Sequence, residues 1–332
     1  MKVLVANQEQ VRALLPMGEC MQAMEQALIT LGKGEALNPL RWGMVLPERV
    51  GVIGMMPAYL SDPPSMGVKV VSVMPHNHSA GYDSHQGTVL LFETAHGCLL
   101  AMLDASEITA IRTAAVSGVA TRLLANPDAG DLAILGSGVQ AVTHLEAMWF
   151  VRPIRRIRVW SRNPEHAIRF AETASERYGC SVEAIDSVEK AVENVDIICT
   201  TTAAPEPILK GEWLSPGAHV NAVGSSVKYT RELDTHAVVR ARLFVDRRES
   251  TLNEAGDFLF PKKEGAIGDD HIVAEIGELL LGTAVGRRSA KELTLFKSLG
   301  LGVEDVASAW HIYRRASETN RGTWVEWAKT PA

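Results

Sequence analysis

The segment from Gly136 to Ala141 reads Gly-Ser-Gly-Val-Gln-Ala, which has the G-x-G-x-x-A spacing of a dinucleotide-binding turn. Gly136 permits a tight turn, Gly138 lets a pyrophosphate approach the backbone, and Ala141 lets a helix pack closely against a sheet. The start of that helix would offer N–H groups and the positive end of its dipole to the phosphates. The sequence therefore predicts a dinucleotide site that includes Gly136, Ser137, Gly138, Val139 and Gln140, although a glycine turn without a ligand has the same pattern.

Four residues at the end of the next expected strand, Trp160-Ser161-Arg162-Asn163, indicate which dinucleotide binds. In such folds a carboxylate at this place holds the ribose 2′-hydroxyl of NAD, whereas an arginine accommodates the 2′-phosphate of NADP. The segment has no acid, and the planar fork of an arginine suits a phosphate. We expect Ser161, Arg162 and Asn163 to bind the cofactor, with NADP(H) preferred and NAD(H) possible. The alternative is a solvated Arg162 and a cofactor held mainly by its pyrophosphate.

Three cations, Arg41, Lys69 and Arg112, interrupt segments that otherwise favour burial or a position facing a cleft. Charged side chains rarely occupy such places alone. Together they would form a clamp for a substrate carboxylate, with the arginine forks making bidentate contacts. The alternative is that they form internal ion pairs with Glu93, Asp104 or Glu107.

A polar stretch with His76, Asn77, His78 and His85 raises the question of a metal. No third ligand follows at a suggestive spacing, so we expect surface histidines and no metal site. His85 and Gln86 are also candidates for the lining of a cleft.

The secondary structure that positions these residues differs between two parts of the chain. The first hundred residues are rich in strands, with a hairpin around residues 94–97, and from residue 131 onward strands and helices alternate. The run from Leu132 to Leu135 predicts a buried strand before the glycine turn. Asn7 is expected to cap a first helix, the segment 272–281 is expected to be helical, and a helix-rich tail is expected over 303–328. The fold class is therefore α/β, with a Rossmann dinucleotide-binding domain and a second, α+β domain.

Composition excludes several classes of protein. The 332 residues carry a net charge of −6, which argues against a nucleic-acid partner. No apolar stretch approaches the length of a membrane span, so no membrane partner is expected. The four cysteines are scattered and form no C-x-x-C pair, which favours reduced thiols and a cytoplasmic protein.

The motifs resemble those of the ornithine cyclodeaminase/mu-crystallin family, in order and over nearly the whole chain. The matching segments are Gly67-Val68-Lys69-Val70-Val71, His85 to Phe92, Glu107 to Ala115, the glycine turn, Asn221-Ala222-Val223-Gly224 and Phe296 to Gly300. The resemblance implies a substrate-binding and dimerisation domain over 1–115 and 303–332, a Rossmann domain over 116–302, and a homodimer. It also implies that Arg41, Lys69 and Arg112 surround the substrate carboxylate. Along the cofactor it places Thr113, Val139, Gln140, Ser161, Arg162, Thr201, Val223 and Ser298.

Two departures from the cyclodeaminases of this family bear on the reaction. They resemble one another in a glutamate where this chain has Gly54, and in an aspartate where it has Ser225-Ser226. Without these acids the chain looks poorly equipped to cyclise ornithine with loss of ammonia. With Arg162, it is more similar to the mu-crystallin and ketimine reductase branch.

These observations lead to the hypothesis of an NAD(P)H-dependent reductase that converts a small α-imino acid, a ketimine or an imine of a 2-oxo acid, to an L-amino acid by hydride transfer to C=N. Lys69 and Arg112 are the catalytic candidates, and Arg41, Lys69, Arg112 and Ser225 are expected to bind the imino or amino acid. The alternatives are an amino-acid cyclodeaminase that recycles NAD, and a small-molecule binding protein that depends on NADPH.

Overall fold

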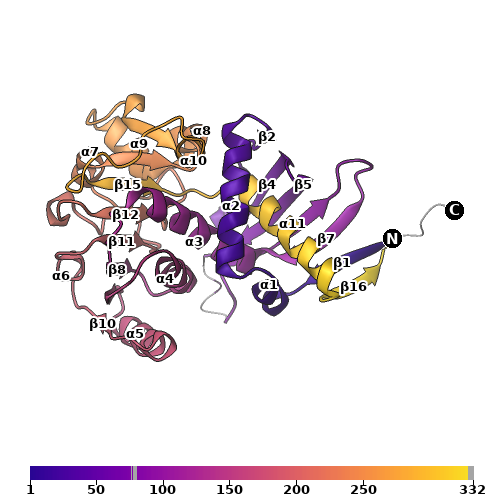
Figure 1. Ribbon diagram of the computed structural model, residues 1–332, viewed down its shortest axis with the longest axis horizontal. Helices are drawn as coiled ribbons and strands as arrows, with labels where there is room; N and C mark the ends of the chain where they lie inside the picture. The colour runs from indigo at the N-terminus through magenta and orange to yellow at the C-terminus, as the bar shows by residue number, and fades with distance from the viewer. Residues whose placement is uncertain (76, 78–80, 328–332) are drawn as a thin grey trace. The chain divides into compact units, whose positions relative to one another are not determined.

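The computed structural model describes residues 1–75, 77 and 81–327, and its contacts divide the chain into two units. The first unit consists of Met1–Arg112 and Leu301–Ala332, and the second is the continuous segment Thr113–Gly300. The boundary falls within one helix, α3 (Ala105–Leu124). Each unit contains its own sheet (Figure 1).

The sheet of the first unit has the strand order β16-β1-β7-β6-β5-β4-β2, and β3 pairs with β4. Neighbouring strands from β4 to β7 are antiparallel, and β6 and β7 form the hairpin expected around residues 94–97. The strands are β1 (Lys2–Ala6), β2 (Ala36–Leu37), β3 (Trp42–Val45), β4 (Val52–Ser61), β5 (Pro64–Val73), β6 (His85–Phe92), β7 (Leu99–Asp104) and β16 (Thr323–Glu326).

Helices α1 (Gln8–Leu14), α2 (Met17–Gly32) and α11 (Gly302–Thr319) complete this unit, together with a short 3₁₀ turn over Pro47–Arg49. Helix α11 packs on β4 to β7 and against α2 (Figure 1). Asn7 caps α1 as expected, because its side chain accepts a hydrogen bond from the Gln10 amide at 3.0 Å. The expected helical tail ends earlier than predicted, at Thr319, and β16 follows it.

The second unit contains a fully parallel sheet in the order β10-β9-β8-β11-β12-β15-β13-β14. Its first five members have the 3-2-1-4-5 order of a Rossmann fold. The strands are β8 (Asp131–Leu135), β9 (Arg156–Trp160), β10 (Val182–Ala184), β11 (Ile197–Thr200), β12 (His219–Ala222), β13 (Arg242–Val245), β14 (Ile272–Glu275) and β15 (Thr294–Lys297). The predicted fold class, a Rossmann domain with an α+β domain, is confirmed.

The helices of the second unit lie between these strands in the chain. They are α4 (Val139–Val151), α5 (Pro164–Tyr178), α6 (Val188–Val192), α7 (Thr235–Arg240), α8 (Arg248–Glu254), α9 (Gly256–Lys263) and α10 (Ile276–Leu280), with 3₁₀ turns over Gly211–Trp213 and Asp269–His271. The expectation of one helix over 272–281 is wrong, because Ile272–Glu275 pairs with β13 as a strand. Such a short apolar run has no periodicity that separates strand from helix. Among the described residues, no helix is long and apolar enough to cross a membrane.

Candidate active site

The glycine turn lies between β8 and α4, as the motif predicts. Gly136 has φ +122°, and a Cβ there would lie 2.6 Å from Oγ1 of Thr201, so only glycine fits. A Cβ on Gly138 would meet no atom within 4 Å, so packing within the protein does not require a glycine at this position. Gly138 is also the N-cap of α4 and makes no side-chain capping bond. The N-terminus of α4, which no side chain caps, and the open space beside Gly138 together fit a pyrophosphate.

The end of β9 lies beside this turn. Ser137 Oγ donates to Ser161 Oγ at 3.0 Å, and the carbonyl of Trp160 accepts the Gly136 amide at 2.8 Å. Arg162 is exposed. Asn163 has a structural task, because its side chain accepts the Glu165 amide at 3.0 Å and caps α5.

The loops after β11, β12 and β15 carry the other residues expected along the cofactor. Thr201 Oγ1 donates to the Leu135 carbonyl at 3.1 Å. The amides of Val223 and Ser298 donate to the carbonyls of Thr200 and Ala222, each at 3.0 Å, so the three loops are bonded to one another. Thr113 is buried on α3, whereas Val139 and Gln140 form the first turn of α4.

A buried carboxylate that the sequence analysis missed, Glu232, fixes two of these loops. It accepts hydrogen bonds at 2.7 Å from the hydroxyls of Thr200 and Thr202 and from the amides of Thr202 and Gly224. Burial raises the pKa of Glu232, and the nearby Asp257 adds to this shift, while the two threonine bonds oppose it. Gly224 has no room for a side chain, because a Cβ would lie 2.1 Å from the Thr202 carbonyl.

Lys297 anchors the end of β15 beneath the same loops. Its Nζ donates to the carbonyls of Ala222 at 3.0 Å and Ser225 at 2.5 Å, and lies 3.1 Å from Oδ2 of Asp257. Ser225 itself donates to the Thr230 carbonyl at 2.6 Å. Its hydroxyl hydrogen is therefore used inside its own loop, and the expected contact with a substrate is limited to acceptance of a hydrogen bond.

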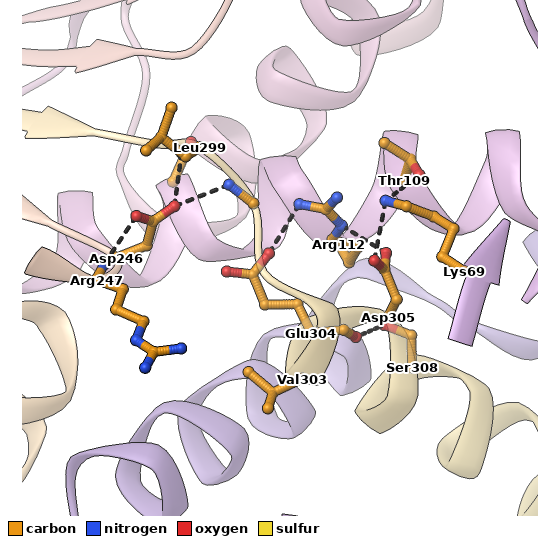
Figure 2. A network of polar contacts seen from close by, with 12 residues as sticks. Lys69, Thr109, Arg112, Asp246, Arg247, Leu299, Val303, Glu304, Asp305 and Ser308 are labelled. Carbon is orange, nitrogen blue, oxygen red and sulfur yellow. Dashed lines mark hydrogen bonds and ion pairs between the residues drawn. The ribbon is translucent and has the colours of Figure 1, made fainter. Parts of the chain in front are cut away.

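In the first unit, Lys69 and Arg112 meet at the start of α11 (Figure 2). Arg112 donates to Asp305 Oδ1 from Nε at 3.0 Å and to Glu304 Oε2 from Nη1 at 2.8 Å. Nζ of Lys69 lies 2.9 Å from Asp305 Oδ2 and donates to Thr109 Oγ1 at 3.3 Å. All four ionic side chains are at most 5% exposed.

Lys69 and Arg112 therefore pair with Glu304 and Asp305, and the ion pairs described for them do not include Glu93, Asp104 or Glu107. Glu93 accepts the amides of its own hairpin turn, Asp104 caps α3 through the Glu107 amide, and Glu107 pairs with Arg12 at 2.5 Å. Glu304 and Asp305 were missed because two acids in the first turn of a helix are ordinary dipole-stabilising residues. No local signal relates them to Arg112, which is more than 190 residues away.

The charges around Lys69 change its acidity. Burial and, to a smaller extent, the positive charges of Arg112 and Arg41 together lower the pKa of the Lys69 ammonium to about 8. The Asp305 carboxylate opposes these effects. Arg41 is half-buried directly before β3.

The histidine-rich stretch gives no metal centre within the described residues. His76 and His78 lie outside them, and His85 Nδ1 is 2.9 Å from Oγ of Ser84. Across the described ranges, no group of three or more histidine, cysteine, aspartate or glutamate side chains is arranged to hold a metal.

A parallel sheet in Rossmann order, with an open glycine turn after β8, is typical of a dinucleotide-binding enzyme. The chain belongs to the ornithine cyclodeaminase/mu-crystallin family, whose model matches residues 1–320. It is 41% identical to mouse ketimine reductase mu-crystallin over 293 residues. The matched region covers 87% of this chain and 90% of the relative. It is 36% identical to the Bacillus cereus Δ1-pyrroline-2-carboxylate reductase over 327 residues, 98% of this chain and 100% of the relative.

Solved structures of similar fold include two with bound cofactors. The Thermococcus litoralis Δ1-pyrroline-2-carboxylate reductase, in complex with NADH and L-proline, superimposes with a TM-score of 0.94 at 40% identity, over 97% of this chain and 99% of that one. An archaeal alanine dehydrogenase dimer with bound NAD gives a TM-score of 0.93 at 31% identity, over 99% of this chain and 100% of that one.

Proposed function

We propose that the chain reduces small α-imino acids to L-amino acids, with NADPH as the preferred hydride donor. The relatives support this class of reaction, since a ketimine reductase and a pyrroline-2-carboxylate reductase match nearly their whole length. The observation that carries the proposal is Lys69, a buried ammonium beside Arg112 and Arg41 with a pKa lowered to about 8.

The cation cluster suits a carboxylate. Arg41 and Arg112 lie close enough to Lys69 for their positive charges to lower its pKa, while Glu304 pairs with Arg112 and Asp305 pairs with both Arg112 and Lys69. A substrate carboxylate would add charge-assisted hydrogen bonds to these cations in a low-dielectric place, where such a contact is strong. The two acids hold the cations in position before the substrate arrives, which reduces the ordering needed on binding.

Lys69 is the proposed general acid. A protonated imine is the better electrophile, and an ammonium with a pKa of about 8 keeps its proton at neutral pH yet releases it more readily than an ordinary lysine. When bound, the nicotinamide supplies the hydride that the imine carbon accepts. Lys69 passes one proton to the imine nitrogen and recovers it from solvent, so that the C=N bond becomes CH–NH.

Positions 54 and 225, where the cyclodeaminases of the family carry acids, argue against cyclodeamination by this chain. Gly54 lies opposite Gly43 and Val71 in the sheet, and Ser225 is bonded to Thr230. Neither position offers a carboxylate to handle a second amino group. This supports a net reduction over a lyase that returns the hydride to its cofactor.

The preference for NADPH rests on Arg162. It is exposed next to Ser161, which is bonded to the glycine turn through Ser137, and the end of β9 has no carboxylate. Arginine in this place suits a 2′-phosphate.

A homodimer through the first unit is part of the proposal. Helix α11 covers the face of the sheet that carries Lys69, because Lys69 pairs with Asp305. The opposite face presents Met55, Val68, Val70 and Leu90, all half-buried or exposed in the single chain. Such an apolar sheet face favours association with a second copy.

An NADPH-oxidation screen tests the function. The substrates are cyclic ketimine carboxylates, and 2-oxo acids mixed with ammonia or methylamine. We expect turnover with at least one imine and formation of the L-amino acid. Ammonia release from ornithine without net oxidation of NADPH would favour the cyclodeaminase instead, and tight ligand binding without turnover of any imine would favour a binding protein.

A further inference from the structure

One cross-strand row of the first sheet is almost bare of side chains. Gly43 of β3 lies opposite Gly54 of β4, Gly54 lies opposite Val71 of β5, and Val71 lies opposite Gly87 of β6. Directly opposed residues point to the same face of a sheet. Three of the four positions in this row therefore project no side chain.

The bare row is adjacent to the proposed carboxylate site. The next row on the same face consists of Met56, Lys69 and Val89, two residues away along the strands, which is roughly 7 Å. This second row is buried, whereas Gly54 and Val71 are half-buried and Gly43 is exposed. The face thus becomes accessible where the glycines begin, immediately beside Lys69.

Two of the three glycines are not required by the fold. A Cβ at Gly87 would lie 2.1 Å from the Val70 carbonyl, so packing explains that glycine. At Gly54 the nearest atom would be Val71 Cγ1 at 3.6 Å, and at Gly43 it would be Val52 Cγ1 at 3.4 Å. Neither residue has a positive φ. Glycine inside a strand lowers stability, and where no steric reason exists it often marks close approach of a ligand.

We propose that Gly43 and Gly54 determine substrate specificity by leaving room for the ring or the apolar side chain of the α-imino acid. The inference rests on the proposed function, in which Lys69 and Arg112 hold the substrate carboxylate. The favoured class is imino acids with several apolar carbons, such as five- and six-membered cyclic ketimine carboxylates. The row carries no ionisable side chain, so a second carboxylate or ammonium on the substrate would lose water there without an ionic contact from the row.

The test compares two substrates with full-length wild type and Gly54→Val. One is the six-membered ketimine Δ1-piperideine-2-carboxylate, and the other is the small imine formed from pyruvate and ammonia. We expect the valine to lower kcat/KM for the ring by about tenfold or more, mainly through KM, and to change the small imine by less than about threefold. The Tm should not fall, because valine suits a strand better than glycine.

Gly43→Val is the second variant, and it should shift the ratio of the two kcat/KM values in the same direction. Met44→Leu is the matched control, because Met44 belongs to the same hairpin but points to the opposite face. If the valine at position 54 lowers the Tm, Gly54→Ala takes its place, since a Cβ there makes only ordinary contacts.

The outcomes separate this inference from the proposed function. Wild-type turnover of an imine with an unchanged substrate ratio in the folded variants, or an equal loss for both substrates, would overturn the specificity role alone. Wild type that reduces no imine in the panel would overturn both.

Discussion

The carboxylate of Asp305 lies 2.9 Å from the ammonium nitrogen of Lys69, and both side chains are almost completely buried. The same carboxylate accepts a hydrogen bond from Arg112. Asp305 therefore compensates two cations that the proposed mechanism needs, and it controls how readily Lys69 gives up a proton.

The first prediction concerns the pH dependence of kcat/KM, which reports groups of the free enzyme. The proposed mechanism needs Lys69 protonated, so activity should fall as the pH rises through its pKa of about 8. Asp305 opposes the lowering of this pKa, so Asp305→Asn should move the fall to lower pH. Glu304→Gln is the control, because Glu304 pairs with Arg112. An unmoved alkaline limb in Asp305→Asn would remove Lys69 as the proton donor.

Arg162→Ala should raise the KM for NADPH by about tenfold or more, because it removes a charge-assisted contact with the 2′-phosphate. The KM for NADH should stay within about twofold. Lys190→Ala provides a control, since Lys190 pairs with Asp186 on the surface of the same unit. Equal effects on both cofactors would contradict the preference for NADPH.

The two glycines of the turn should respond differently to alanine. Gly136→Ala should destabilise the protein, because its Cβ would overlap Thr201 and its φ is +122°. Gly138→Ala should keep the wild-type Tm, since its Cβ meets open space, yet weaken cofactor binding by obstructing the pyrophosphate. Thermal unfolding and fluorescence titration with NADPH measure the two effects. Normal cofactor affinity in Gly138→Ala would place the pyrophosphate elsewhere.

Glu232→Gln should lower the free energy of unfolding by about 2–4 kcal/mol, because the new amide turns an acceptor of buried hydrogen bonds into a donor. Urea denaturation measures this loss. Glu206→Gln, at an exposed site of the same unit, is the control. A stability change below about 0.5 kcal/mol would mean that these bonds do not hold the loops.

The proposed dimer predicts that Val68→Lys gives a monomer, because it adds a charge to the apolar sheet face. Light scattering measures the mass, and Val239→Lys, at an exposed position of α7, is the control. A wild-type monomer, or an unchanged dimer in Val68→Lys, would exclude this face as the interface.

The glycine turn could be predicted from the sequence because strand, turn and helix follow one another directly in the chain. The same locality allowed the capping of α1 by Asn7 to be predicted. Glu304 and Asp305 escaped prediction because their relation to Arg112 exists only after the chain has folded back on itself. The composition near β9 suggested Asn163 as a cofactor contact, but gave no sign that its side chain caps α5. Ser225 was assigned from its place in the family pattern, which does not reveal its bond to Thr230.

The divided first unit has a consequence for biosynthesis. Residues 113–300 form a continuous unit that can fold once it has been synthesised, whereas Glu304 and Asp305 follow it in the chain and emerge later. Until then, Lys69 and Arg112 lack the acids that neutralise them in the native state. The nascent N-terminal sheet therefore cannot complete its ionic core until residues 304 and 305 have been synthesised, long after its own strands β4 to β7.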